Sequence, residues 1–289
     1  MNSLNLKLLR KLPLFRQCWI STGYVMHAQM RHRHHNHIQH NLGLSLQYEE
    51  DVAVIHLNSG SDNRINHTFL KDLNSLLDSV IGNSSCKGLV TTGEGKYYSN
   101  GLDLEWMETI SGQELIEFMH DLQRLYLKIL LFPLPTLAVL NGHTYAGGAI
   151  LAFAHDLRTM NSDKGWLCFN EVHLNKRVSL FIKEYLKIKL GGGKNVSDAL
   201  VLGRRYSSDD AHRNHLVHAA HPSQSLLDFS LQVLQSFYGK DGYTRQGLLN
   251  MKKDIYKLPI EAFDRDVKDK LPYMAIQFMT ESQLSNIGA

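Results

Sequence analysis

Apolar and polar residues begin to alternate at Leu44, and this pattern predicts a β-hairpin at the start of the folded domain. Residues 44–48 alternate, residues 52–57 (VAVIHL) form a β-branched and aliphatic run, and acidic turn residues separate the two segments. A helix is predicted over 68–81, because leucines and Val80 recur at helical spacing before Gly82 and Asn83 end it. The next predicted strand covers 88–92.

Strand and helix patterns then alternate along the middle of the chain. A loop over 93–101 leads to an amphipathic helix within 113–131, a strand over 136–140 and a helix start at 146–148. This order favours an α/β fold with crossover connections over a sandwich. After about residue 223 the pattern is mostly helical, most clearly over 226–237 and 244–256. We therefore expect three parts: a presequence and His-rich linker (1–42), a core (43–222) and a C-terminal helical region (223–289).

Charge is distributed unevenly along the 289 residues, which carry 31 Lys and Arg and 28 Asp and Glu. Residues 1–48 contain six basic side chains and no acid, so the remainder holds 25 basic and 28 acidic residues. A body of that charge has no general attraction for nucleic acid, so we expect no nucleic-acid partner. The best apolar run, 129–140, contains two prolines, and we expect no membrane span.

The basic N-terminus has the composition of a mitochondrial presequence. Its leucines at 4, 8, 9 and 12 can share a helical face beside Lys7 and Lys11, which favours import into the mitochondrial matrix. A disordered terminus or a secretory signal is the alternative, although Lys7, Arg10 and Lys11 interrupt the apolar run that a signal peptide needs. Peroxisomal and cytoplasmic locations stay open, but the ending Ile287-Gly288-Ala289 is unlike the peroxisomal Ser-Lys-Leu address.

Neither cysteines nor histidines predict a metal site. The three cysteines are widely spaced and odd in number, so they suit neither a disulfide framework nor structural zinc: Cys18, Cys86 and Cys168. The histidines clustered in the leader favour a solvated linker over a metal site, which needs support from surrounding groups: His32, His34, His35, His37 and His40.

Two glycine-containing segments carry the candidate chemistry, residues 97–104 (YYSNGLDL) and 141–149 (NGHTYAGGA). Neither has the Lys-Ser/Thr ending of a phosphate loop or the spacing of a dinucleotide site, so ATP and NAD are poor candidates. A strand-to-helix junction offers free backbone N–H groups at the positive end of a helix dipole. Two such amides would form an oxyanion hole, unless the segments are ordinary turns.

The ordered segments TTGEGKYYSNGLDLEWM, PLPTLAVLNGHTYAGGAILAFAHDLRTM and GWLCFNEVHL strongly resemble the crotonase superfamily, also called the enoyl-CoA hydratase/isomerase family. The match extends over residues 44–217. It implies a spiral of repeated β-β-α units with C-terminal trimerisation helices, assembled as a homotrimer or a dimer of trimers. It also implies an acyl-CoA thioester substrate, no separate cofactor, and oxyanion amides on Leu102 and Gly147. The implied substrate-binding residues are Ser99, Asn100, Gly101, Asp103 and Gly148.

The acids in this match indicate the reaction. The resemblance puts the first of the two hydratase glutamates at Ile150, which cannot move a proton, and the second at Glu171. A single glutamate resembles the pattern of delta-3, delta-2 enoyl-CoA isomerases, in which one base removes the alpha proton and returns it at the gamma carbon. We expect Trp166, Leu167 and Phe169 to desolvate Glu171 and raise its pKa.

Other polar residues near these motifs are assigned to structure. Asp103 follows a glycine turn and is expected to cap a helix, with a contact to the CoA side of the substrate. His143 and His155 more often pack or form hydrogen bonds at such positions than act in catalysis.

The chain departs from the family at residues 173–178 (HLNKRV), where many relatives have a Gly- and Pro-containing turn, and at His215, where a glycine is usual. The first departure leaves three functions open. They are an enoyl-CoA isomerase of unsaturated fatty-acid oxidation, another crotonase reaction such as thioester hydrolysis or dehydration, and a silent acyl-CoA-binding homologue with a closed pocket.

Overall fold

The computed structural model describes residues 36–41, 43–270 and 272–287. The predicted presequence and His32, His34 and His35 lie outside this part of the chain. Residues 36–41 form a strand that pairs with the predicted hairpin, so the sheet begins before the boundary expected at residue 43. Within the described ranges no helix is long and apolar enough to cross a membrane.

Seven strands form the larger sheet, in the order β1-β2-β3-β4-β6-β8-β10. The first three pair antiparallel and the others pair parallel. Their bounds are β1 Asn36–Asn41, β2 Leu44–Glu49, β3 Val52–Leu57, β4 Gly88–Gly93, β6 Thr136–Leu140, β8 Leu157–Asn161 and β10 Ala219–His221.

A smaller parallel sheet follows the order β5-β7-β9. Its strands are β5 Tyr97–Ser99, β7 His143–Tyr145 and β9 Leu167–Cys168. Successive strands of the chain alternate between the two sheets, since β4, β6 and β8 of the larger sheet are each followed by β5, β7 or β9. The predicted spiral of β-β-α units is therefore confirmed.

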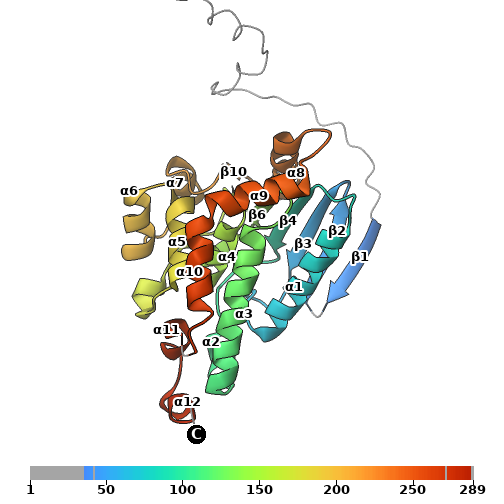
Figure 1. Cartoon of the computed structure of the whole chain (residues 1–289). Helices are drawn as coiled ribbons and strands as arrows, with labels where there is room; N and C mark the ends of the chain where they lie inside the picture. The colour runs from blue at the N-terminus through green and yellow to red at the C-terminus, as the bar shows by residue number, and fades with distance from the viewer. Residues whose placement is uncertain (1–35, 42, 271, 288–289) are drawn as a thin grey trace, which may run out of the picture. The chain divides into compact units, whose positions relative to one another are not determined.

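The helices cover both faces of the larger sheet (Figure 1). In the spiral and its connections they are α1 His67–Gly82, α2 Leu104–Met107, α3 Gly112–Leu130, α4 Gly147–Ala154, the 3-10 helix η1 Glu171–Leu174, α5 Leu180–Leu190, α6 Gly193–Val196, the π-helix η2 Ser197–Val201 and α7 Ser208–Arg213. The C-terminal region holds η3 Ser223–Ser225, α8 Leu226–Tyr238, α9 Arg245–Ile255, α10 Lys257–Asp266, α11 Tyr273–Ile276 and α12 Glu281–Ser285.

Alternation along β3 divides the core into two layers. Ala53, Ile55 and Leu57 join the cluster formed with α1, α3, α4 and α5, whereas Val52 and Val54 pack on the opposite face with α8. Successive side chains of a strand point to opposite faces, so one strand serves both layers. This burial confirms the hairpin and the helices predicted from apolar spacing, whose ends lie within one or two residues of the predicted ones.

Local polar contacts begin several helices where the sequence predicts a start. Asn66 caps α1 by accepting a hydrogen bond from the amide of Phe69 at 3.1 Å. Ser111 and Glu114 form a reciprocal capping box at α3. His215, at the position where the resemblance implies glycine, adopts a left-handed conformation with φ +57°. That conformation costs a non-glycine residue roughly 1 kcal/mol.

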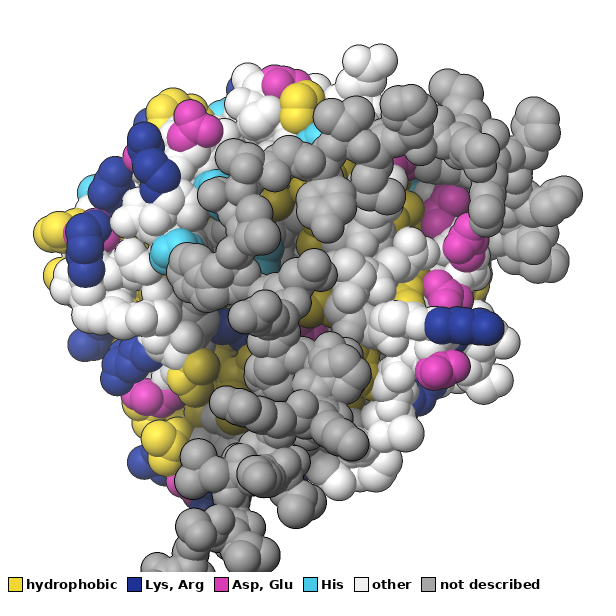
Figure 2. Space-filling model, turned by 90° about the horizontal axis from the view of Figure 1, so that it is seen from above, with side chains coloured by type: hydrophobic (Ala, Val, Ile, Leu, Met, Phe, Trp, Pro, Cys, Tyr) yellow, Lys and Arg dark blue, Asp and Glu magenta, His cyan; other side chains and the backbone are white. Residues whose placement is uncertain are grey.

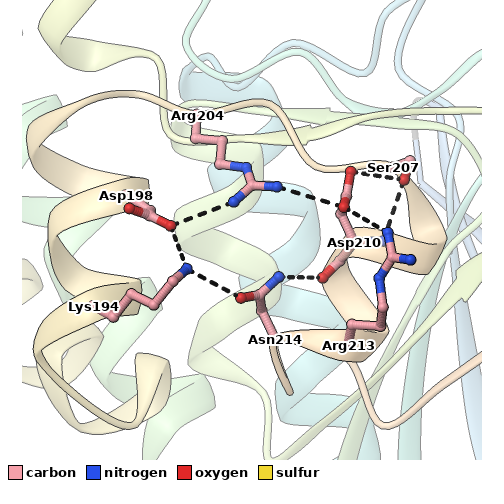
Figure 3. A network of polar contacts seen from close by, with 7 residues as sticks. All are labelled: Lys194, Asp198, Arg204, Ser207, Asp210, Arg213 and Asn214. Atoms are coloured by element: carbon pink, nitrogen blue, oxygen red, sulfur yellow. Dashed lines mark hydrogen bonds and ion pairs between the residues drawn. The ribbon is translucent and has the colours of Figure 1, made fainter.

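Figure 2 shows Lys and Arg side chains mainly toward the left edge of one face, and Asp and Glu more toward the right. The left edge is where α6 and α7 lie in Figure 1. Ion pairs between Lys194, Asp198, Arg204, Asp210 and Arg213 connect these two helices (Figure 3).

Candidate active site

The turn after β5 is held by the buried hydroxyl of Ser99. Its Oγ donates to the carbonyl of Asn63 at 2.7 Å and accepts from the amide of Gly101 at 3.2 Å. Neither Ser99 nor Gly101 lines the cavity described below. Their contacts instead shape the turn that carries Asn100 and Leu102, which do line it.

A parallel bridge to Ile65 orients the amide of Leu102. Ile65 donates to the carbonyl of Gly101 at 2.8 Å, and the amide of Asp103 donates to the carbonyl of Ile65 at 3.0 Å. In such a bridge the central residue directs its own N–H to the opposite side. Within the described chain the N–H of Leu102 has no acceptor, so it is free for a ligand.

The second free amide belongs to Gly147, the first residue of α4. Ala146 before it has φ +45° and ψ −122°, a conformation that L-residues rarely adopt and that is typical of functional turns. Tyr126 fixes the first turn of α4 by donating its hydroxyl to the carbonyl of Gly147 at 3.0 Å. No acceptor for the N–H of Gly147 exists among the residues that the structure describes.

Glycines allow the two turns to approach each other. A Cβ on Gly101 would lie 3.0 Å from the amide nitrogen of Gly147, and one on Gly148 would lie 2.5 Å from the carbonyl oxygen of Ser99. Gly148 is thus buried behind the cavity and supports α4. The arrangement places two free amides on adjacent turns, where they can hold an oxygen that gains negative charge.

Glu171 begins η1, which follows β9 after Phe169 and Asn170, and it lines the same cavity as the two amides. Part of the residue is exposed, but its carboxyl group is almost fully enclosed. This burial raises the pKa of Glu171 to about 7, against the opposing effect of a hydrogen bond from its own amide. A carboxyl group of that pKa both accepts and returns a proton near neutral pH.

The expectation that Trp166, Leu167 and Phe169 share a pocket with Glu171 is wrong. Leu167 and Phe169 are buried in the core, Trp166 is 42% exposed, and none of the three lines the cavity. Residues adjacent along a strand point to opposite faces, so neighbours in sequence need not share the pocket. Apolar residues from distant segments, among them Leu122, Ile150 and Met274, line the cavity with Glu171 instead.

The cavity has a volume of about 290 Å³ and joins Glu171 to Leu102 and Gly147. Ile150 also lines it, at the position that the resemblance gives to the first hydratase acid. The other lining residues are Arg64, Asn100, Leu104, Glu105, Leu122, Tyr126, Ala146, Asn170, Leu174, Lys176, Arg177, Val178, Met274 and Phe278.

Several of these lining residues were not predicted. Leu122 and Tyr126 occupy successive turns of the predicted amphipathic helix, but apolar spacing does not distinguish a cavity wall from a core. Met274 and Phe278 come from the C-terminal segment, and no motif identifies them. Leu174, Lys176, Arg177 and Val178 belong to the segment that departs from the family.

Glu105 and Asp103, the two other acids near the cavity, have structural partners. Glu105 is the other carboxylate of the cavity lining, and its side chain is 85% exposed and paired with Arg64 at 3.2 Å. Asp103 lies outside the lining and caps α2 by accepting from the amide of Trp106 at 3.3 Å, which confirms the predicted capping role. The described lining therefore contains one enclosed carboxyl group, that of Glu171.

Two histidines near the motifs have structural surroundings. His155 is fully buried between the hydroxyl of Thr91 and the carbonyl of Leu151, each at 3.0 Å, and burial lowers its pKa to about 3. His143 stacks on Tyr145 outside the cavity lining. The described residues contain no group of His, Cys, Asp and Glu arranged to hold a metal ion.

The loop after η2 supports the helix that carries Glu171. The carbonyl of Gly203 contacts Nε2 of His173 at 3.1 Å and accepts from Sγ of Cys168 at 3.3 Å. Arg204 next to it pairs with Asp198 and Asp210, both at 3.4 Å, within the network of Figure 3. The loop therefore contacts η1 through Gly203 and is tied to η2 and α7 by the ion pairs of Arg204.

Similarity to known proteins agrees with this geometry. A family model described as enoyl-CoA hydratase/isomerase matches residues 47–268. The chain is 28% identical over 220 residues to enoyl-CoA delta isomerase 3 of Arabidopsis thaliana, covering 73% of this chain and 91% of that protein. It is 30% identical over 181 residues to a putative enoyl-CoA hydratase of Thermus thermophilus, covering 61% and 70%.

Solved structures show the same fold. The human mitochondrial delta3-delta2-enoyl-CoA isomerase superposes with a TM-score of 0.75 at 19% identity, covering 84% of this chain and 95% of that one. The family match extends over most of the described residues and includes both amide turns and Glu171. The chain therefore belongs to the enoyl-CoA hydratase/isomerase family, the crotonases, and is a crotonase-type acyl-CoA enzyme.

Proposed function

We propose that this protein is a delta-3, delta-2 enoyl-CoA isomerase, which moves the double bond of a 3-enoyl-CoA to the 2-trans position in unsaturated fatty-acid oxidation. One observation carries the proposal: a single enclosed carboxyl group with a pKa of about 7 shares a cavity with two free amides. Ile150, at the other acid position, supplies no second group to activate water, and Glu105 in the lining is exposed and paired with Arg64.

In this mechanism ionised Glu171 removes a proton from C2 of the thioester. The electrons move to the carbonyl oxygen, and the resulting dienolate is held by the amides of Leu102 and Gly147. Each such donor is worth roughly 3 to 4 kcal/mol in the transition state. The protonated carboxyl then delivers the proton to C4, and the double bond comes to lie between C2 and C3. We propose no separate cofactor, because the CoA is part of the substrate.

Supporting residues act through these groups. Asn100 lies on the cavity wall and is proposed to contact the substrate directly. Ser99, Gly101, Asp103 and Gly148 are proposed to act on substrate binding through the turns that they shape, since none of them lines the cavity.

Incubation of the purified protein with a 3-enoyl-CoA and a 2-enoyl-CoA tests the reaction. We expect isomerisation of the first and no hydration of the second. Hydration without isomerisation would favour another crotonase reaction, and no turnover of either would favour a silent acyl-CoA-binding homologue. The open cavity argues against the silent homologue, which requires a closed pocket.

We also propose self-association as a trimer or a dimer of trimers. Apolar side chains lie exposed at helical spacing across α9 and α10: Met251 at 61%, Ile255 at 57% and Leu258 at 64%. Such a stripe favours burial against another chain. Light scattering on the parent and on Met251→Asp checks this. A monomeric parent would contradict it, and Asp in the stripe should weaken assembly.

For location we propose the mitochondrial matrix. The basic, acid-free residues 1–48 support it, as does the mitochondrial human structural relative. Two Arabidopsis relatives are named as peroxisomal, so a peroxisomal reporter signal is the competing outcome. A fusion of residues 1–42 to a fluorescent reporter distinguishes the two locations.

A further inference from the structure

Three cations line the cavity, and one of them is neutralised. Arg64 pairs with three carboxylates, of which Glu105 is nearest at 3.2 Å. Lys176 and Arg177 differ, because no described carboxylate lies within ion-pair distance of either. They belong to the segment that departs from the family, directly after the helix that carries Glu171. The cavity therefore has two positive charges without a negative partner.

The C-terminal segment holds both cations in place. The ammonium of Lys176 donates to the carbonyl of Gln277 and lies 4.7 Å from the ring centre of Phe278. The guanidinium of Arg177 stacks on Tyr273 at 3.8 Å and donates from Nε to the Tyr273 hydroxyl at 2.5 Å. The side-chain amide of Gln277 also binds the Arg177 backbone: its Oε1 accepts from the N–H of Arg177 at 2.7 Å, and its Nε2 donates to the carbonyl of Arg177 at 2.6 Å.

These contacts leave donors available. The guanidinium of Arg177 uses only Nε in the hydrogen bonds of the described residues, so Nη1 and Nη2 keep the planar fork that matches carboxylate and phosphate oxygens. Lys176 keeps two of its three N–H donors. Stacking and the Gln277 bonds hold the Arg177 side chain before any ligand arrives, which lowers the entropy that binding costs.

The two cations and the oxyanion amides belong to different parts of the cavity lining. Lys176 and Arg177 contact the C-terminal segment through Gln277, Phe278 and Tyr273, whereas the amides of Leu102 and Gly147 lie on the turns after β5 and before α4. An anion bound by the two cations therefore belongs to a different portion of the ligand from the thioester oxygen.

We infer that Lys176 and Arg177 form a binding subsite for an anionic group of the substrate, a carboxylate or a phosphate, at a distance from the thioester. The inference rests on the proposed function only in taking the ligand to be an acyl-CoA. Two parts of such a ligand carry the required chemistry: a carboxylate at the far end of the acyl chain, or the phosphates of CoA. A carboxylate would make the enzyme selective for dicarboxylic acyl groups.

Equilibrium binding of unreactive saturated thioesters tests the subsite without turnover. The probes are hexanoyl-CoA, the mono-CoA thioester of hexanedioic acid, and S-hexanoyl-pantetheine, which lacks all the phosphates of CoA. Calorimetry compares the parent with Lys176→Gln and Arg177→Gln. Arg177→Lys retains the charge, and Lys187→Gln removes an equal charge from an exposed lysine on α5. Circular dichroism checks that each variant is folded.

If the anion is an acyl carboxylate, the parent binds the hexanedioyl thioester about tenfold more tightly than hexanoyl-CoA. Lys176→Gln and Arg177→Gln lose this preference, while Arg177→Lys keeps part of it and Lys187→Gln keeps all of it. If the anion is a phosphate of CoA, the parent binds hexanoyl-CoA more tightly than S-hexanoyl-pantetheine. This preference is about tenfold smaller in Lys176→Gln and Arg177→Gln than in the parent.

Equal ratios in the parent and both Gln variants, for both probe comparisons, would overturn the subsite. Because none of the probes reacts, this result is independent of the isomerase assay. A protein that fails to isomerise 3-enoyl-CoA but shows the Lys176- and Arg177-dependent preference would lose the proposed reaction and retain the subsite.

Discussion

Burial of Glu171 links catalysis to stability at a single carboxyl group. Its pKa in the folded protein is about 7, whereas an unperturbed glutamate titrates at 4.5. The folded state therefore holds the proton more tightly than the unfolded chain does, and stability falls as the pH rises between these values. Above pH 7 the folded protein carries the full cost of an enclosed carboxylate.

The rate of isomerisation should depend on pH through the ionisation of Glu171. Only ionised Glu171 can accept the C2 proton, so kcat/KM for isomerisation should rise about tenfold per pH unit below pH 7 and level off above it. Initial rates with a 3-enoyl-CoA between pH 5 and pH 9 measure this. A profile that is already flat at pH 5 would show that the base has an ordinary glutamate pKa.

Glu171→Gln should lose activity and gain stability. The amide keeps the side chain's size but cannot accept the proton, so isomerisation should fall roughly a hundredfold to ten-thousandfold. Removing the enclosed charge should raise the free energy of unfolding by about 1 to 3 kcal/mol at pH 8 and much less at pH 5. Urea denaturation at the two pH values measures this difference, and equal gains at both would contradict the linkage.

At the scale of the element, adjacent glycines at the start of α4 have different tasks. A Cβ on Gly147 would make ordinary contacts of 3.4 Å with Leu102 and Tyr126, whereas one on Gly148 would lie 2.5 Å from the Ser99 carbonyl oxygen. Gly147→Val should therefore cost roughly a hundredfold to a thousandfold in rate with a small change in stability. Thermal denaturation and kcat measure the two effects.

Gly148→Ala is the matched comparison. The added methyl group would lie too close to the backbone carbonyl oxygen of Ser99, so the backbone must shift. We expect this to destabilise the protein by about 1 to 3 kcal/mol. If both variants lost stability equally, the separation between a ligand-facing and a packing glycine would be wrong.

Element bounds could be predicted because apolar spacing is a local property. The strand at 136–140 was predicted with the bounds it has, and the helix predicted over 68–81 differs from α1 by one residue at each end. The surroundings of Glu171 could not be predicted in the same way. Trp166, Leu167 and Phe169 precede it closely in sequence, but much of the cavity lining comes from α3, α4 and the C-terminal segment.

At the scale of the whole molecule, the last part of the chain completes the site. Met274 and Phe278 line the cavity that contains Glu171, which lies about a hundred residues earlier in the chain. Gln283 of α12 donates to the carbonyls of Met107 and Ile110 at 3.0 and 2.6 Å. The family resemblance predicts the chemistry in the spiral and implies only trimer contacts for the C-terminal helices. Packing between distant segments leaves no local pattern that would have revealed this second role.

Phe278→Ala tests whether the C-terminal segment enclosing the cavity sets the pKa of Glu171. Removing the ring opens space at the wall, and water that enters favours the ionised carboxyl, so the pKa should fall from about 7 toward 4.5. The midpoint of the pH–rate profile should shift downward by about half a unit or more, together with a loss of activity. Phe237→Ala on α8, where the side chain is 52% exposed and outside the cavity lining, is the control and should leave the midpoint unchanged. An unshifted midpoint in an active Phe278→Ala enzyme would mean that the walls contributed by the spiral alone desolvate Glu171.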